Sequence, residues 1–282
     1  MTMSSTPPAG WYADPWRVAN WRWWDGGQWT GYTDHQPLVS PTAPVAYPAV
    51  RTVDDQSRPI RAGWIALGGA VGGVALSVVV YLVLRVLGAE RNSPLVTLAV
   101  QFGLWIPLVV ACIIAVRRHG SGSLRDLGLT VRWVDLALGL GFSVAALIGV
   151  GNIARALKSI GIEPHRTSVL EPLRRSTLTT IVIVFIAVIG APIVEELFFR
   201  GLLMSGLVSR WGAAIGIIAQ AALFGLVHLG PADARGNLGV FLLIAPLGAV
   251  LGVLRYSFKR LGPGIVTHAL YNAAIVAYAL SR

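Results

Sequence analysis

The sequence predicts an all-α polytopic membrane protein with seven or eight transmembrane helices, preceded by a small β-rich, Trp-rich N-terminal domain. The first observation is composition, because the 282 residues are 55% hydrophobic and only 13% charged. The second is spacing, since the apolar residues come in blocks of about twenty, the length that a helix needs to cross a bilayer. The third is that six of the ten tryptophans fall between Trp11 and Trp29, ahead of these blocks.

Residues 1–33 are expected to form the small N-terminal domain. Polar and aromatic residues alternate on both sides of residues 25–27 (Asp-Gly-Gly), a turn signal typical of a hairpin or a three-stranded sheet. A unit of this size depends on large aromatic side chains, because each buries on the order of 150–250 Å². The tryptophans are therefore interpreted as its core. The alternative is an aromatic surface that binds a peptide or another protein partner.

The same stretch resembles a short Trp-rich domain of unknown function found at the N-termini of many actinobacterial membrane proteins. The Gly-Trp-Tyr-x-Asp-Pro opening at residues 10–15 and the Arg-Trp-Trp-Asp-Gly-x-x-Trp-Thr segment at residues 22–30 carry the resemblance. It says little about function.

Residues 34–62 are interpreted as a semi-extended linker to a transmembrane domain at 63–282. The segment has few large apolar residues and contains five prolines: Pro37, Pro41, Pro44, Pro48 and Pro59. Arg51, Arg58 and Arg61 precede the first apolar block, so the positive-inside rule predicts a cytoplasmic N-terminus. We therefore expect a multi-pass protein of the cell membrane.

Seven apolar blocks are long enough to cross a bilayer of roughly 30 Å. They are Gly63–Leu87, Leu95–Val116, Val134–Ile153, Leu178–Leu207, Gly212–Leu229, Leu238–Leu254 and Gly264–Leu280. The fourth block is overlong, and the count is eight if it consists of two pieces. With seven spans, the arginines of residues 117–133 are cytoplasmic, whereas Arg155 and Lys158 lie on the opposite side, in conflict with the positive-inside rule.

The net charge of +10 does not indicate nucleic-acid binding. The basic residues are nearly all arginines scattered between the apolar blocks, which is the pattern of membrane topology. Membrane lipid is therefore an expected partner, and nucleic acid is not. The single cysteine, Cys112, excludes an intrachain disulfide.

Two adjacent glutamates, Glu195 and Glu196, are the only charged residues between Thr177 and Phe199. An ionised carboxylate at membrane depth costs at least about 2.5 kcal/mol, so such groups are expected to be paired, protonated or functional. Glu196 and Arg200 are four residues apart and share a helix face, which predicts an ion pair. Glu195 faces a different neighbour, and we interpret it as the functional carboxylate and Glu196 as a structural one.

Two of the five histidines, His228 and His268, fall in apolar blocks. Asn272 follows His268 by one helical turn, and Phe224 precedes His228 by the same spacing. A carboxylate with two imidazoles can hold and deprotonate a water molecule. The same set could ligate Zn²⁺ with water in the fourth position. The spacing leaves both possibilities open.

Three motifs follow one another along these blocks: Glu-Glu-x-x-x-Arg at 195–200, Phe-x-x-x-His at 224–228 and His-x-x-x-Asn at 268–272. In this order they resemble the CAAX prenyl protease type 2 family, over roughly residues 130–282. The family includes bacterial Abi proteins linked to bacteriocin processing and immunity. The resemblance implies a multi-helix intramembrane endopeptidase that cleaves membrane-associated peptides or proteins.

The resemblance also implies roles for the residues of the motifs. Glu195 would be the main base that polarises water, helped by His228, and His268 with Asn272 would form the oxyanion site. Glu196 would support the fold together with Arg200, and Phe224 belongs to the second motif. The family is labelled a metalloprotease family, with Glu195, His228 and His268 as the possible zinc ligands, and a metal-free glutamate mechanism is also argued for it.

The positions of the two histidines pose a geometrical problem. His228 lies near the end of its block and His268 near the start of a block that runs in the same direction. A common depth then requires strong tilt, a broken helix or another span count. Gly190 and Pro192 predict a bend in Leu178–Leu207, which would place the glutamates beside a water-filled cavity.

Two other functions fit the same residues. One is a non-catalytic membrane scaffold or bacteriocin-immunity protein. The other, which we favour less, is a proton-coupled transporter, because buried Glu and His residues also mark proton paths. Transporters usually contain inverted repeats, and the sequence has no internal repeat.

Overall fold

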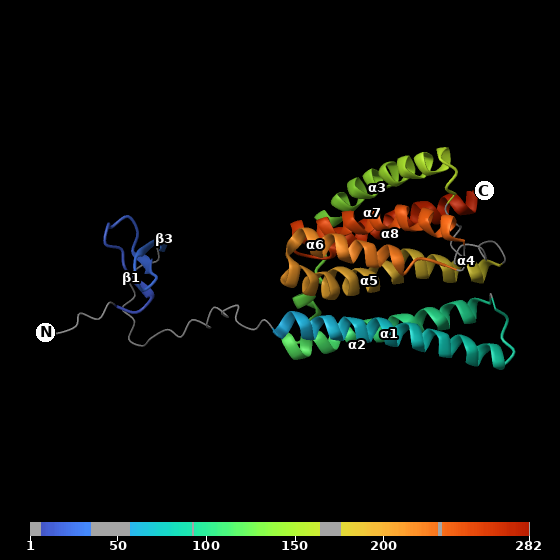
Figure 1. Ribbon diagram of the computed structural model, residues 1–282, viewed down its shortest axis with the longest axis horizontal. Helices are drawn as coiled ribbons and strands as arrows, with labels where there is room; N and C mark the ends of the chain where they lie inside the picture. The colour runs from blue at the N-terminus through green and yellow to red at the C-terminus, as the bar shows by residue number, and fades with distance from the viewer. Residues whose placement is uncertain (1–6, 35–56, 92, 164–175, 231–232, 282) are drawn as a thin grey trace. The chain divides into compact units, whose positions relative to one another are not determined.

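The computed structural model describes residues 7–34, 57–91, 93–163, 176–230 and 233–281. For residues 57–62 it describes the backbone alone. The chain divides into two compact units, Met1–Asp54 and Asp55–Arg282. The first contains a small sheet and the second is a bundle of long helices (Figure 1). The predicted fold class, a helical membrane protein with a small β-rich N-terminal unit, is confirmed.

The first unit is a three-stranded antiparallel sheet in the order β1-β2-β3. Its strands are β1 (Gly10–Ala13), β2 (Trp21–Trp24) and β3 (Trp29–Asp34). The turn between β2 and β3 forms at the predicted Asp-Gly-Gly signal. Asp25 Oδ1 accepts hydrogen bonds from Gly27 N at 2.8 Å and from Gln28 N at 2.7 Å, and Gly26 has a φ of 102° that favours glycine.

Asp14 organises the loop between β1 and β2. Its carboxylate accepts hydrogen bonds from the Arg22 side chain at 2.7 Å and from the backbone of Val18 and Ala19, both at 2.9 Å. The Arg22 guanidinium and these backbone donors hold the pKa of Asp14 well below its ordinary value. The Asp14 side chain is fully buried, so this carboxylate is satisfied by protein groups inside the N-terminal unit.

The second unit consists of long helices that lie side by side (Figure 1). The α-helices are α1 (Ser57–Val86), α2 (Pro94–His119), α3 (Val134–Ser159), α4 (Thr177–Val184), α5 (Ala191–Glu195), α6 (Met204–Leu226), α7 (Ala234–Phe258) and α8 (Gly262–Ser281). A short 3₁₀ helix, η1 (Leu124–Leu127), follows α2. Two π-helical segments, η2 (Phe185–Gly190) and η3 (Glu196–Leu203), flank α5.

Six helices of the described part of the chain are long and apolar enough to cross a membrane. The outer surface of the unit is apolar as well: Val74, Val78 and Leu82 of α1 are each about half exposed. Water would not favour such a surface, whereas lipid tails do. The described helices therefore support a multi-pass membrane protein.

The fourth candidate span, Thr177–Leu226, contains a chain reversal. As a straight helix its 50 residues would measure about 75 Å, more than twice the thickness of the hydrocarbon core. At Gly212 the backbone leaves helical geometry, with φ 81° and ψ 170°. A Cβ on Gly216 would lie 2.7 Å from Val208 N, although eight residues of straight helix would separate them by about 12 Å. The chain therefore folds back at Gly212, in agreement with the seven predicted spans.

The helix that carries the glutamates departs from α-helical geometry where Gly190 and Pro192 predicted an irregularity. The π-helical segments η2 and η3 lie on either side of Pro192. Such wide turns free backbone carbonyls for other partners. Gly190 is required here, because a Cβ would overlap the ring of Trp105 on α2.

Helix α8 begins inside the bundle. Residues 261–264 are all buried, and Leu261 N donates to Gly128 O at 2.8 Å, while Gly262 N donates to Thr130 O at 3.1 Å. This pairing holds the start of α8 away from the surface. The sequence posed the problem that His268 lies near the start of its block and His228 near the end of its own. Because α8 starts below the bundle surface, His268, two turns further on, lies deeper in the bundle than the start of an ordinary span would place it.

An ion pair next to this pairing joins α3 to the segment before α8. Arg260 donates to Asp135 Oδ1 from Nη2 at 2.6 Å and from Nε at 3.1 Å, and Asp135 also accepts from Arg132 N at 2.8 Å. The Asp135 carboxylate raises the pKa of Arg260. Asp135 is fully buried, so this charge is satisfied entirely by protein groups.

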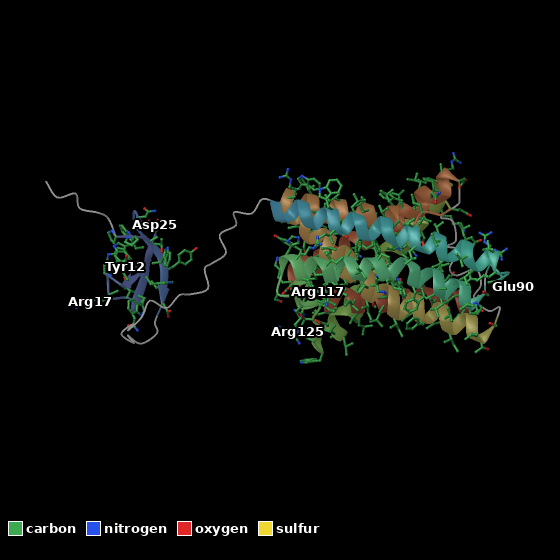
Figure 2. The ribbon with its side chains drawn as sticks, turned by 90° about the horizontal axis from the view of Figure 1, so that it is seen from below. Tyr12, Arg17, Asp25, Glu90, Arg117 and Arg125 are labelled. Atoms are coloured by element: carbon green, nitrogen blue, oxygen red, sulfur yellow. The ribbon has the colours of Figure 1, made fainter. Side chains whose placement is uncertain are left out.

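Two of the arginines predicted to be cytoplasmic, Arg117 and Arg125, lie at one end of the helical unit. Figure 2 shows Arg117 and Arg125 at this end and Glu90 at the opposite end. The cytoplasmic location of the N-terminus stays a prediction. Most of the predicted linker lies outside the described residues, and α1 begins at Ser57, before the first predicted span.

Candidate active site

The two glutamates lie where α5 passes into η3 and have different surroundings. Glu196 is fully buried and its Oε1 lies 2.9 Å from Nη1 of Arg200, which is also fully buried. The predicted ion pair is therefore confirmed. The Glu195 side chain is 16% exposed, and Arg200 makes no ion pair with it among the described contacts. Glu195 is the more accessible of the two carboxylates.

Arg200 is held by two groups in addition to Glu196. Its guanidinium lies 4.1 Å from the centre of the Phe224 ring, a cation–π contact, and Nη2 donates to Gly248 O at 3.2 Å. The same carbonyl accepts a hydrogen bond from Nε2 of Gln220 at 2.9 Å. A charge buried in this way is fixed in position, because moving it would uncover several polar groups at once.

His268 of α8 lies between the two glutamates. Its Nδ1 is 3.4 Å from Glu196 Oε1 and its Nε2 is 4.0 Å from Glu195 Oε2. The expected proximity of His268 to Glu195 is thus observed, and the contact with Glu196 is additional. Gly264, in the first turn of α8, permits it, since a Cβ there would lie 2.8 Å from Glu196 Oε2. A carboxylate at the start of a helix is also favoured by the helix dipole.

His228 lies just beyond the end of α6 and is half-buried. Its Nδ1 is 2.6 Å from Phe224 O, and its ring centre is 4.6 Å from that of Phe224. His268 contacts the same ring, because the ring centres of Phe224 and His268 are 5.9 Å apart. Phe224 therefore contacts both histidines, and no described hydrogen bond or ion pair joins His228 to either glutamate.

Asn272 lies one turn beyond His268 on α8, as predicted. Its Nδ2 donates to Ala187 O at 2.8 Å, a carbonyl of the π-helical segment η2. The bond ties α8 to the helix that carries the glutamates. A side-chain amide has two N–H groups, so one donor of Asn272 is left for another acceptor.

Several buried polar atoms of the site have no aligned hydrogen bond within the described residues. They are Glu195 Oε2, Glu196 Oε1, Glu196 Oε2, Arg200 Nε, Arg200 Nη1, Gln220 Oε1 and His268 Nδ1. Buried polar groups are normally satisfied by protein or by ordered water. The separation of 4.0 Å between Glu195 Oε2 and His268 Nε2 fits a water molecule that bonds to both. The site can therefore hold one water between a carboxylate and an imidazole.

The predicted zinc ligands do not gather into a metal site. Among the residues that the structure describes, no group of three His, Cys, Asp or Glu side chains is arranged to hold a metal ion. Glu195 and His268 approach each other, whereas no described polar contact joins His228 to either of them. The side chains in this arrangement do not fit a three-ligand zinc site, and zinc stays a prediction.

Gln220 is a site residue that the sequence interpretation did not include. It is fully buried and lies one turn before Phe224 and two turns before His228, on the same face of α6. Its only signal in the sequence is a polar amide within the apolar block Gly212–Leu229. Its partner, the Gly248 carbonyl, could not be foreseen because it depends on the packing of α6 against α7.

Residues 177–274 match the family described as Type II CAAX prenyl endopeptidase Rce1-like. The matched segment is roughly a third of the chain and contains all three motifs. The family recognised in the sequence is thereby confirmed for these residues. No curated protein and no solved structure matches the chain.

Proposed function

Since residues 177–274 form an Rce1-like domain, we propose that the chain is an intramembrane endopeptidase that cleaves membrane-associated peptides or proteins. The observation that carries the proposal is the position of His268 between the carboxylates of Glu195 and Glu196. These groups are largely buried within helices that are apolar enough to cross a membrane. A retained cluster of ionisable groups at this depth is a functional site by default.

In the proposed mechanism, one water molecule donates one hydrogen bond to Glu195 Oε2 and another to His268 Nε2. Glu196 lies by Nδ1 of the same imidazole and favours the tautomer with hydrogen on Nδ1, which leaves Nε2 as an acceptor. The water oxygen then directs a lone pair at the scissile carbonyl. Glu195 takes one proton as the water attacks, and returns it to the leaving amine when the C–N bond breaks.

The developing oxyanion needs donors on the far side of the carbonyl. Asn272 has one N–H that Ala187 O does not use, and we propose it for this role. His228 donates through Nδ1 to the Phe224 carbonyl, so its neutral ring presents Nε2 as an acceptor, and we propose it as a proton carrier and not as a second oxyanion donor. In this scheme His268 orients the water, whereas the sequence interpretation gave it the oxyanion.

Glu196 and Arg200 have a supporting role in this proposal. The ion pair fixes Glu196 beside His268 Nδ1, and Phe224 and Gly248 O fix Arg200. Zinc stays a separate expectation, which elemental analysis of active, tag-free protein would test. No step above depends on it.

The proposal is tested by cleavage of membrane-anchored peptides by the purified full chain in lipid nanodiscs. Wild type is compared with Glu195→Gln, His268→Ala and His228→Ala, and Glu90→Gln serves as a control at an exposed glutamate. We expect full turnover by wild type and Glu90→Gln, a small fraction of it by His228→Ala, and none by Glu195→Gln or His268→Ala. Equal turnover by all variants would contradict the proposal. Absence of turnover in every one, with a folded wild type and a broad peptide set, would favour the non-catalytic scaffold.

A further inference from the structure

The sheet of the N-terminal unit has two faces, which the strand register separates. Opposite residues of paired strands lie on the same face, and successive residues of a strand alternate between faces. Trp24 pairs with Trp29, and Arg22 pairs with Thr33, so these four side chains share one face. We call it the covered face.

The covered face contacts other parts of the same unit, although Trp16 beside it is 58% exposed and Thr33 on it is exposed as well. Trp24 Nε1 donates to Pro7 O at 3.0 Å, so the chain before β1 lies over it. The loop after β1 adds Trp16, whose ring packs edge-on against Trp29 with centres 6.4 Å apart and lies 4.5 Å from the Arg22 guanidinium. These contacts pack the rings against one another, but the six tryptophans of the unit are half-buried or exposed, so their interpretation as a buried core stays a prediction.

The opposite face carries four more aromatic side chains. Trp11 pairs with Trp23, Trp21 pairs with both Ala13 and Asp34, and Tyr32 is two residues before Asp34 on β3. The register therefore gathers Trp11, Trp21, Trp23 and Tyr32 on one side of the sheet, which we call the aromatic face. Trp11 is 40% exposed and Tyr32 is 72% exposed. Aromatic rings gathered at a surface in this way usually mark a docking site.

The chemistry of the aromatic face fits a membrane interface. Tryptophan and tyrosine concentrate where hydrocarbon meets headgroups, because each ring has an apolar body and a polar group at one end. Charge does not favour a polyanion, since the described residues 7–34 contain two arginines and three aspartates, a difference of −1. The attraction would therefore come from the rings and not from basic groups.

The length of the chain keeps the sheet close to a bilayer. Asp34 ends β3 and Ser57 begins α1, the first helix of the membrane unit. The residues between them, fully extended, span at most about 80 Å. A tethered unit meets its partner at high effective concentration, so a weak affinity is sufficient. A free peptide is not tethered to the chain, so it would have to bind the aromatic face without this high effective concentration.

We propose that the aromatic face docks on the headgroup region of the lipid bilayer into which the chain's own helices insert. The occupant is a lipid surface, zwitterionic lipid is sufficient, and docking is insensitive to salt. This proposal does not depend on the proposed peptidase activity.

Two single-cysteine labels on the full chain in nanodiscs test it. Ala13→Cys places a fluorophore on the aromatic face, and Thr33→Cys places it on the covered face at an exposed position. Cys112 is buried and does not compete for the label. Brominated lipid quenches a probe in the bilayer, and iodide quenches a probe in water. We expect stronger quenching by brominated lipid at Ala13→Cys than at Thr33→Cys, unchanged at high salt.

Substitutions in the labelled Ala13→Cys background give the second arm. Tyr32→Ala removes an exposed ring and is expected to weaken docking on the order of tenfold. Val18→Ala is the control, because Val18 is 70% exposed but lies in the loop outside the aromatic face. Equal lipid quenching at the two labels, or no effect of Tyr32→Ala, would overturn the proposal. Protection of Ala13→Cys from both quenchers would also overturn it, because a protein surface would then cover the face.

Discussion

Replacement of the two adjacent glutamates, one at a time, is expected to separate a structural carboxylate from a functional one. Glu196 and Arg200 are both fully buried and 2.9 Å apart. Arg200→Leu leaves the Glu196 carboxylate without its partner, and breaking a buried pair in this way costs about 3–5 kcal/mol. Glu196→Gln costs less, about 2 kcal/mol, because Arg200 keeps the Phe224 ring and the Gly248 carbonyl. Glu195→Gln is expected to cost under about 1 kcal/mol, since no Arg or Lys pairs with Glu195 among the described contacts.

The assay is reversible unfolding of the purified chain in mixed micelles, followed for the single variants and for the double variant Glu196→Leu/Arg200→Leu. Removing both partners leaves no buried charge, so the double variant is expected to be more stable than Arg200→Leu alone. The coupling free energy should be about 1–3 kcal/mol. Additive effects, or a Glu195→Gln variant as unstable as Glu196→Gln, would refute the division of roles between the two glutamates.

Four further predictions concern the surroundings of the site and the small domain. Gln220→Leu should lower the free energy of unfolding, measured in the same assay, by about 1–2 kcal/mol, because the buried hydrogen bond from Gln220 Nε2 to Gly248 O is lost. Gly264→Ala should cost about 1–3 kcal/mol and slow peptide cleavage, because the new Cβ crowds Glu196 Oε2; unchanged stability and turnover would contradict the packing described. Gly212→Ala should cost about 1 kcal/mol or more, because alanine does not favour a φ of 81° at the chain reversal, and a stabilised variant would contradict it. Asp14→Asn should destabilise the small domain at neutral pH, because the lowered pKa of Asp14 contributes to its stability. This contribution is complete above the ordinary pKa of 3.8 and is lost as the pH falls through the lower pKa of the folded state. The difference in stability between wild type and variant, followed by near-ultraviolet circular dichroism, should therefore vanish in strong acid.

The parts of the fold that the sequence predicts well are those that depend on local spacing. Apolar blocks of about twenty residues predict membrane spans because the bilayer imposes that length. The Glu196–Arg200 pair follows from their separation of four residues on one helix. The turn at Asp25 and its glycines follows from local backbone preferences. These features need no knowledge of the neighbouring elements.

The parts that it predicts less well depend on how distant elements pack. The contact between His268 and Glu196 depends on the depth at which α8 begins, and that depth is set by the pairing of Gly128 with Leu261. The Gly248 carbonyl becomes a shared acceptor only because Gln220 and Arg200 meet at one point of α7. Spacing along the sequence carries no information about such meetings.

The most direct test of the account is the rate of peptide cleavage by the Glu195→Gln variant in nanodiscs, with its unfolding midpoint measured on the same sample. The account predicts a folded protein whose cleavage rate falls by about 10²–10⁴, the usual contribution of a general base. A folded Glu195→Gln variant that cleaves within about threefold of an active wild type would contradict the assignment of Glu195 as the base that activates water.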